Sequence, residues 1–291
     1  MTEQSLTIGR STIGADNAVF IIAEIGINHN GSLENAKKLI DVAVASGCDA
    51  VKFQKRTVEV VYTAAELATP RESVFGTTNG DLKRGLEFDE AAYREIDLHC
   101  KANNIDWFAS CWDESSVDFM EAFAPPCYKI ASASLTDDGL LRHHRKTDRP
   151  IILSTGMSDL PMIEHAVDVL GENDLVILHC TSTYPSQPEE LNLRAIMTLR
   201  ERFPSVPIGY SGHEPGLATT LAAVAVGACV IERHVTLDRA MWGSDQAASV
   251  EPQGIQRLTR DIRSVETALG DGNIKIYDSE RPIIDKLRRV G

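Results

Sequence analysis

Short apolar runs alternate along most of the chain with longer stretches whose apolar residues recur at helical spacing. The short runs predict buried strands, and the longer stretches predict amphipathic helices that pack against them. We expect strands at residues 20–25, 50–53, 107–109, 127–131, 150–154, 175–179, 207–210 and 229–234. We expect helices at residues 32–46, 89–103, 114–123, 137–143, 160–170, 193–202, 216–226 and 252–269.

The strict alternation of strand and helix predicts a parallel sheet. Repeated strand–helix units in a chain of 291 residues fit a TIM (β/α)8 barrel, which typically takes about 250 residues. A doubly wound sheet is the alternative, but no G-x-G-x-x-G motif follows the first strand. We therefore expect a single domain, with a hairpin in residues 1–19, the barrel in 20–270 and a tail in 271–291.

Two segments fall outside the repeat. Residues 4–14 have the pattern of the short N-terminal hairpin, which we expect to close the barrel floor. Residues 54–87 form a long polar segment after the second strand. Long loops that follow barrel strands lie on the catalytic face, so this segment is expected there.

Composition and charge exclude several classes of partner. The chain has 29 Lys and Arg against 42 Asp and Glu, a net charge of −13, which argues against nucleic acid and anionic membranes. Its cysteines form no C-x-x-C pair and are typical of buried thiols in a reducing compartment. We see no signal peptide and no apolar run of about 20 residues that would span a membrane. The cytoplasm is therefore the expected location.

Polar residues gather at the C-terminal ends of the expected strands, where barrel enzymes hold their catalytic groups. Such a residue can also cap the next helix, which is the alternative for Ser110, Asp113 and Ser154. Because every strand end carries polar residues, we expect an active site there. The candidates are Glu24, Lys52, Gln54, Ser110, Lys129, Ser132, Ser134, Ser154, Ser182, Tyr184, Ser211, His213, Glu232 and His234.

Lys52 and Lys129 lie within apolar strands, and a buried lysine needs an anionic partner. Three interpretations are open. The lysines can pair internally with Glu24 or Glu232, or Lys129 can form a Schiff base as in class I aldolases. The interpretation we favour is a pair of cations that binds a phosphate and a carboxylate of the substrate.

His213 and His234 end the seventh and eighth expected strands. Neighbouring parallel strands lie about 4.8 Å apart, so both imidazoles can reach one ion. Together with waters or substrate oxygens they suit Mn²⁺, Mg²⁺, Fe²⁺, Co²⁺ or Zn²⁺, and Glu232 can orient one of these ligands. Among the other histidines, we expect a core position for His179 and a helix surface for His99, His143 and His144. The sequence does not assign a role to His29.

Several motifs together resemble the sialic acid synthase family over about residues 20–269. They are residues 20–31 (FIIAEIGINHNG), 51–54 (VKFQ), 128–132 (YKIAS), 179–185 (HCTSTYP), 209–214 (GYSGHE), 232–234 (ERH) and 242–245 (WGSD). The resemblance implies a TIM barrel that joins phosphoenolpyruvate to an aldose, N-acetylmannosamine or a related sugar. It also implies a divalent metal ion (Mn²⁺, Mg²⁺ or Co²⁺) and a homodimer or higher homo-oligomer.

The resemblance assigns roles residue by residue. Residues that would line the phosphoenolpyruvate pocket are Lys52, Ser110, Lys129, Ser132, Ser154, Ser182 and Ser211. His213 and His234 would bind the metal, and Glu24 would lie close to the reacting centre. The residues that would contact the sugar are Gln54, Ser134, Tyr184 and Asp245.

Two departures from the family pattern point to a different sugar. Ser134 stands where the family usually has an acidic residue, and the chain stops at Gly291 without room for a C-terminal antifreeze-like domain. In the family that domain supplies an arginine to the partner subunit's sugar site. We expect an acceptor other than plain N-acetylmannosamine, and residues 54–87, with Arg56, Arg71 and Arg84, as a lid.

Two other functions remain as alternatives. One is a class I aldolase that uses Lys129 as its Schiff base. The other is a non-catalytic barrel that binds a sugar acid.

Overall fold

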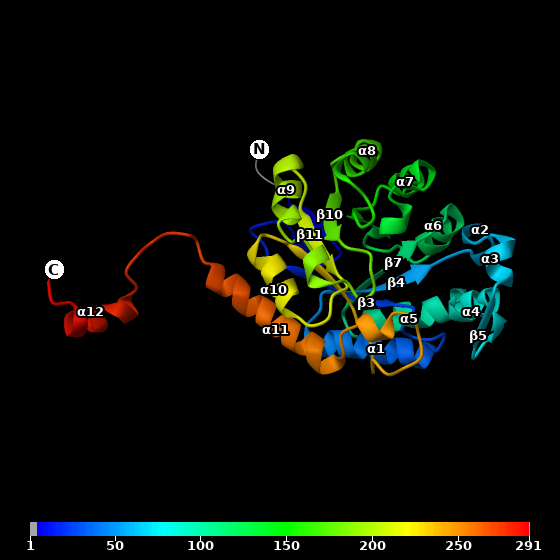
Figure 1. Ribbon diagram of the computed structural model, residues 1–291, viewed down its shortest axis with the longest axis horizontal. Helices are drawn as coiled ribbons and strands as arrows, with labels where there is room; N and C mark the ends of the chain where they lie inside the picture. Colours follow the sequence, from blue (N-terminus) through cyan, green and yellow to red (C-terminus); the bar gives the residue numbers. More distant parts are fainter. Residues whose placement is uncertain (1–4, 291) are drawn as a thin grey trace.

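Parallel strands close into a barrel in the computed structural model, which describes residues 5–290 (Figure 1). The order around the barrel is β10-β11-β12-β3-β4-β7-β8-β9, and each strand pairs in parallel with its neighbours. The predicted TIM barrel is therefore confirmed. The barrel strands are β3 (Phe20–Gly26), β4 (Ala50–Lys55), β7 (Asp106–Cys111), β8 (Tyr128–Ile130), β9 (Ile151–Ser154), β10 (Leu175–Cys180), β11 (Ile208–Gly212) and β12 (Val230–His234).

A layer of helices surrounds the barrel, as Figure 1 shows. The first helix is capped at both ends: the Ser32 hydroxyl accepts the Asn35 N–H at its start, and Gly47 ends it at a φ of 76°. The outer helices are α1 (Leu33–Ser46), α5 (Glu90–Ala102), α6 (Glu114–Glu121), α7 (Asp138–Arg145), α8 (Leu160–Leu170), α9 (Ala195–Arg202), α10 (Ala218–Ala225) and α11 (Pro252–Leu269).

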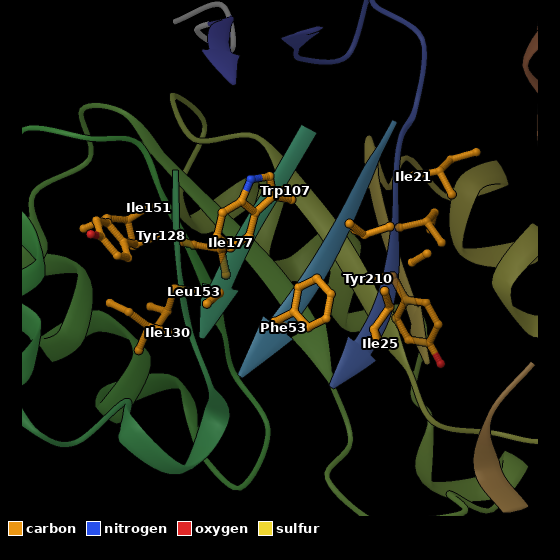
Figure 2. Packing of buried hydrophobic residues seen from close by; sticks show 14 of the residues in the cluster. Ile21, Ile25, Phe53, Trp107, Tyr128, Ile130, Ile151, Leu153, Ile177 and Tyr210 are labelled. Atoms are coloured by element: carbon orange, nitrogen blue, oxygen red, sulfur yellow. The ribbon is translucent and has the colours of Figure 1, made fainter. Parts of the chain in front are cut away.

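Side chains of the barrel strands alternate between two environments, because successive residues of a strand point to opposite faces. In β3, Ile21 and Ile25 belong to the core between strands and helices (Figure 2). Phe20 and Ile22 belong instead to the apolar cluster inside the barrel. Glu24 is the next inward position of this strand. The same alternation leaves the inward positions at the C-terminal strand ends polar.

A hairpin closes the N-terminal end of the barrel. It consists of β1 (Leu6–Ile8) and β2 (Ser11–Ile13), which pair antiparallel. Leu6, Ile8 and Ile13 pack in one cluster with apolar side chains of the barrel interior, and Figure 2 shows the hairpin beyond the starts of the barrel strands. The predicted hairpin is confirmed from residue 5 onward, since residues 1–4 lie outside the described part of the chain.

The segment after β4, predicted as a polar loop, has secondary structure of its own. Its elements are α2 (Val58–Val61), α3 (Ala64–Ala68), β5 (Pro70–Ser73), β6 (Gly76–Thr78) and α4 (Asn79–Leu86). Thr63 and Thr78 begin α3 and α4, each in a capping box with the acidic residue three positions later. The ring of Phe75 lies 6.3 Å from that of Trp242, so the segment reaches the loop after β12.

The remaining elements lie outside the repeating units. After α11, the short helix η4 (Asp278–Glu280) and α12 (Arg281–Leu287) extend away from the barrel in Figure 1. Three more short helices lie in loops that follow barrel strands: η1 (Ser132–Ser134), η2 (Pro188–Glu190) and η3 (Gln246–Ala248). Residue 291 of the predicted tail is outside the described chain. Every helix in residues 5–290 is too short or too polar to cross a membrane.

Candidate active site

Four charged side chains are buried together inside the C-terminal end of the barrel. Lys52 Nζ lies 3.1 Å from Glu24 Oε2 and 3.5 Å from Glu232 Oε2. Lys129 Nζ lies 3.7 Å from Glu232 Oε1. All four residues are at most 4% exposed. Two positive and two negative charges cancel, so the internal pairing that the sequence left open is present, and it limits the cost of burying each charge.

Burial affects the pKa values of these groups in different directions. Burial raises the pKa of Glu24 to about 7, although Lys52 opposes the shift. Burial acts on Glu232 in the same sense, but Lys129 and Lys52 outweigh it and lower the pKa of Glu232 to about 2. Burial also lowers the pKa of Lys129. Glu232 is therefore the fixed counter-ion, and Glu24 is the carboxylate that takes up a proton more easily.

Serine hydroxyls complete the surroundings of the charges. Ser110 Oγ accepts a hydrogen bond from Lys52 Nζ at 3.1 Å, and Ser211 Oγ donates one to Glu232 Oε1 at 2.9 Å. Ser154 Oγ is buried and has no hydrogen-bond partner in residues 5–290. Buried hydroxyls are ordinarily hydrogen-bonded, so this group is available to a ligand.

These groups line one cavity of about 280 Å³. The predicted site residues around it are Glu24, Lys52, Gln54, Ser110, Lys129, Ser132, Ser154, Ser182, Tyr184, Ser211, His213 and His234, together with Glu232. Two predicted residues do not line it. Ser134 is buried at the end of η1, where Ala131, Ser132 and Ala133 take the positions that face the cavity. Asp245 lies beside it, with Oδ2 3.9 Å from His234 Nδ1.

The two histidines predicted as metal ligands lie side by side in this cavity. Their ring centroids are 5.3 Å apart. His213 Nδ1 lies 2.8 Å from the Thr181 carbonyl oxygen; since a carbonyl only accepts, Nδ1 carries the proton and Nε2 is left free. His234 Nδ1 is buried without a hydrogen-bond partner in residues 5–290. Burial and the nearby His213 lower the pKa of His234 well below its usual value, which favours the neutral imidazole that binds metals.

Gln54 and Tyr184 border the same cavity. Gln54 Nε2 donates to Glu24 Oε1 at 2.9 Å and so holds that carboxylate from the side opposite Lys52. The ring of Tyr184 lies 4.1 Å from that of His213 and is 48% exposed. Its position at the mouth of the cavity suits contact with a second, larger substrate.

Besides Ala131 and Ala133, three residues that line the cavity were not predicted as site residues. Cys180 follows Val176 and Leu178 at the inward positions of β10, so the period of two was a usable signal. Trp112 and Met157 follow strands β7 and β9 in turns. No periodicity extends into a turn, and the direction of these side chains was therefore not readable.

The other histidines lie outside the cavity lining. His179 Nε2 bonds the Leu191 carbonyl at 2.7 Å. His29 stacks on Phe88, with ring centroids 4.2 Å apart, and burial lowers its pKa to about 3. The prediction of a surface position was wrong for His144, which is fully buried because its helix turns this side toward the barrel.

Buried lysines, hydroxyls and paired imidazoles at the C-terminal face of a TIM barrel define an enzyme site for a small anionic substrate. Comparisons with known proteins place the chain more closely. The model of the NeuB family matches residues 39–274. Human N-acetylneuraminate-9-phosphate synthase is 39% identical over 279 residues, which cover 94% of this chain and 78% of that protein.

Two further relatives point to the same family. The N,N'-diacetyllegionaminic acid synthase of Campylobacter jejuni is 41% identical, with 92% of this chain and 83% of that protein covered. The crystal structure of a Leptospira borgpetersenii N-acetylneuraminic acid synthetase superposes with a TM-score of 0.87 at 32% identity and covers 99% of each chain. The chain belongs to the NeuB family. The resemblance to sialic acid synthases and the expectation of an enzyme are thereby confirmed.

Replacing Glu232 with glutamine should destabilise the ligand-free protein strongly. The substitution removes the carboxylate that contacts both buried lysines, and the loss of one partner from a buried ion pair costs about 3–5 kcal/mol. We expect a drop of that size in the unfolding free energy from urea denaturation. Glu34→Gln, which breaks an exposed pair with Lys38, should leave it nearly unchanged, because water screens an exposed pair. Equal effects of the two substitutions would show that the buried charges do not stabilise one another.

Proposed function

We propose that this protein condenses phosphoenolpyruvate with an aldose and releases phosphate, giving a 2-keto-3-deoxy sugar acid of the sialic acid type. One observation carries the proposal. Two buried lysines, several hydroxyls and two adjacent imidazoles line a single cavity. The names of the relatives, an N-acetylneuraminate-9-phosphate synthase and an N,N'-diacetyllegionaminic acid synthase, support a reaction of this type.

The lysine side of the cavity suits phosphoenolpyruvate. Its phosphate and carboxylate need cations and hydroxyl donors in a site shielded from water. Because the glutamates neutralise both lysines when no substrate is present, the anion must displace one carboxylate from a lysine. Glu232 contacts both lysines, whereas Glu24 contacts Lys52 alone. We therefore assign Glu24 as the carboxylate that gives way.

A divalent metal ion fits the imidazole side. His213 keeps Nε2 free, and His234 has a buried nitrogen without a hydrogen-bond partner in residues 5–290. Within that range no group of three or more His, Cys, Asp or Glu side chains could hold a metal. His213 and His234 would therefore hold the ion with water and substrate oxygens, a donor set that suits Mn²⁺, Mg²⁺ or Co²⁺. When bound, it polarises the aldehyde oxygen as a Lewis acid.

The protein's own residues then position the two substrates. The enol carbon of phosphoenolpyruvate bonds to the aldehyde carbon, water adds to the resulting oxocarbenium centre, and the C–O bond to phosphate breaks. Lys52 and Lys129 hold an anion whose charge persists through these steps. Glu24, released from Lys52 and still held by Gln54, positions the water and accepts its proton.

The sugar is assigned to the mouth of the cavity, where Gln54 and Tyr184 line the wall and Asp245 lies beside His234. Ser134 does not line the cavity, so we propose no sugar contact for it. The expectation of an acceptor other than plain N-acetylmannosamine stays a prediction. The homo-oligomer implied by the family and the cytoplasmic location expected from the composition stay predictions.

A panel of aldoses tests the proposed reaction. The protein, phosphoenolpyruvate and Mn²⁺ are incubated with N-acetylmannosamine and other amino and deoxy aldoses at equal concentration, and released phosphate is measured. We expect release that depends on the aldose, with an acceptor other than N-acetylmannosamine used fastest. If no aldose caused phosphate release, the proposal would be contradicted. If N-acetylmannosamine were used fastest, only the choice of acceptor would be contradicted. Borohydride with a keto acid should trap no adduct on Lys129.

Replacing His213 or His234 with alanine should abolish metal-dependent phosphate release and leave the circular dichroism spectrum unchanged. Both imidazoles are assigned to one ion, so neither alone should hold it. His165→Ala, on the surface of α8 with its side chain 62% exposed, is the matched control and should keep activity. Full activity of EDTA-treated protein without added metal would overturn the assignment.

A further inference from the structure

Arg56 and Trp112 form a stacked pair at the edge of the cavity. The guanidinium carbon of Arg56 lies 4.6 Å from the centroid of the Trp112 ring. Trp112 lines the cavity itself, and Arg56 is only 7% exposed behind it. Neither residue has a role in the reaction described above. The two come from the ends of the neighbouring strands β4 and β7.

Both members of this pair have a buried N–H group without an acceptor. Arg56 Nε and Trp112 Nε1 make no hydrogen bond within residues 5–290. An indole and a guanidinium can only donate, and buried donors are ordinarily paired. Two unpaired donors in one stack therefore indicate an acceptor that the described chain does not supply.

The orientation of the Gln54 amide adds a third donor. Arg56 Nη2 donates to Gln54 Oε1, and because a guanidinium cannot accept, the oxygen of the amide must face it. Gln54 Nε2 then donates to Glu24 Oε1 at 2.9 Å. This nitrogen carries two hydrogens, so one N–H remains for a ligand. Gln54 consequently meets a substrate as a donor.

Two cations, one of them Arg56 itself, and two carboxylates lie at the pair. Glu87 Oε2 lies 3.3 Å from Lys55 Nζ, and Glu87 Oε1 lies 3.4 Å from Arg56 Nη1. The Asp113 carboxylate, next to Trp112, accepts the Thr57 N–H at 2.7 Å. Because these charges balance, the unpaired N–H groups themselves select the ligand atom, and they favour a carbonyl or anionic oxygen, which only accepts hydrogen bonds.

We propose that Trp112 and Arg56, together with the free N–H of Gln54, form a subsite for an oxygen of the acceptor sugar that accepts hydrogen bonds without donating. An acyl carbonyl and a phosphate oxygen both have this chemistry. The subsite determines which aldose is used, and this inference rests on the proposed condensation reaction. Trp112 and Gln54 line the cavity and face the sugar away from the bond that forms, and Arg56 positions the Trp112 ring from behind.

Trp112→Phe tests the subsite by removing one N–H while keeping an aromatic ring beneath Arg56. Three acceptors are compared: N-acetylmannosamine, its 6-phosphate, and mannose, which has neither group. For the acceptor that carries the recognised oxygen, KM should rise about tenfold, with kcat and the KM for phosphoenolpyruvate nearly unchanged. The KM for mannose should not change. Arg56→Lys, which keeps the charge but loses the planar stack, should produce the same selective rise.

Trp107→Phe is the matched control. The Trp107 indole donates to Asp97 at 3.1 Å and belongs to the core between strands and helices (Figure 2). Its replacement should leave every KM unchanged.

The acceptor arms separate the two sources of the oxygen. A KM rise with both N-acetylmannosamine and its 6-phosphate identifies the acyl carbonyl, which both sugars carry, and a rise confined to the 6-phosphate identifies the phosphate; either result supports the subsite. An equal rise with mannose would overturn it, and so would failure of the wild type to use either oxygen-bearing sugar. The proposed reaction would still stand in both cases if any aldose in the panel released phosphate.

Discussion

Two lysines buried inside the barrel require two carboxylates. This requirement determines which side chains can stand at the C-terminal ends of the barrel strands. The parallel strands turn every second side chain inward. At the lower inward positions these side chains are apolar, and the hairpin seals them from water. At the upper positions the charges of Lys52, Lys129, Glu24 and Glu232 can be buried together because they cancel.

The cavity that these four charged side chains line has walls of different chemistry. The lysines and serine hydroxyls form one wall, where the proposed anion would displace Glu24 while Glu232 stays between the lysines. The paired imidazoles of His213 and His234 form a second wall, suited to a metal ion. Arg56 and Trp112 stand at a third edge, where donors lack acceptors. In the proposed reaction, this arrangement brings an anion, an aldehyde and the remainder of a sugar together in one small space.

From the sequence we could predict the cavity residues that lie in strands, where side chains alternate with a period of two. The cavity residues that lie in turns were missed. Glu24, Lys52 and Ser110 follow from inward alternation, and so would Cys180. The turn residues Trp112 and Met157 line the cavity, whereas Ser134 does not, because the direction of a turn side chain depends on backbone angles that no periodicity reveals. The helices of the segment after β4 were missed although their capping boxes were readable. The ion pairs were open to prediction only as one of three alternatives, since pairing depends on distances across the barrel.

The central claim is that the buried lysines bind phosphoenolpyruvate, and Lys129→Met tests it most directly. The substitution keeps the length of the side chain and removes the charge that faces Glu232. In steady-state kinetics the account predicts at least about a tenfold rise in the KM for phosphoenolpyruvate with a lower kcat, and an unchanged KM for the aldose. Lys101→Met, at a side chain that is 69% exposed, should behave like the wild type. A change in the KM for the aldose alone would contradict the account.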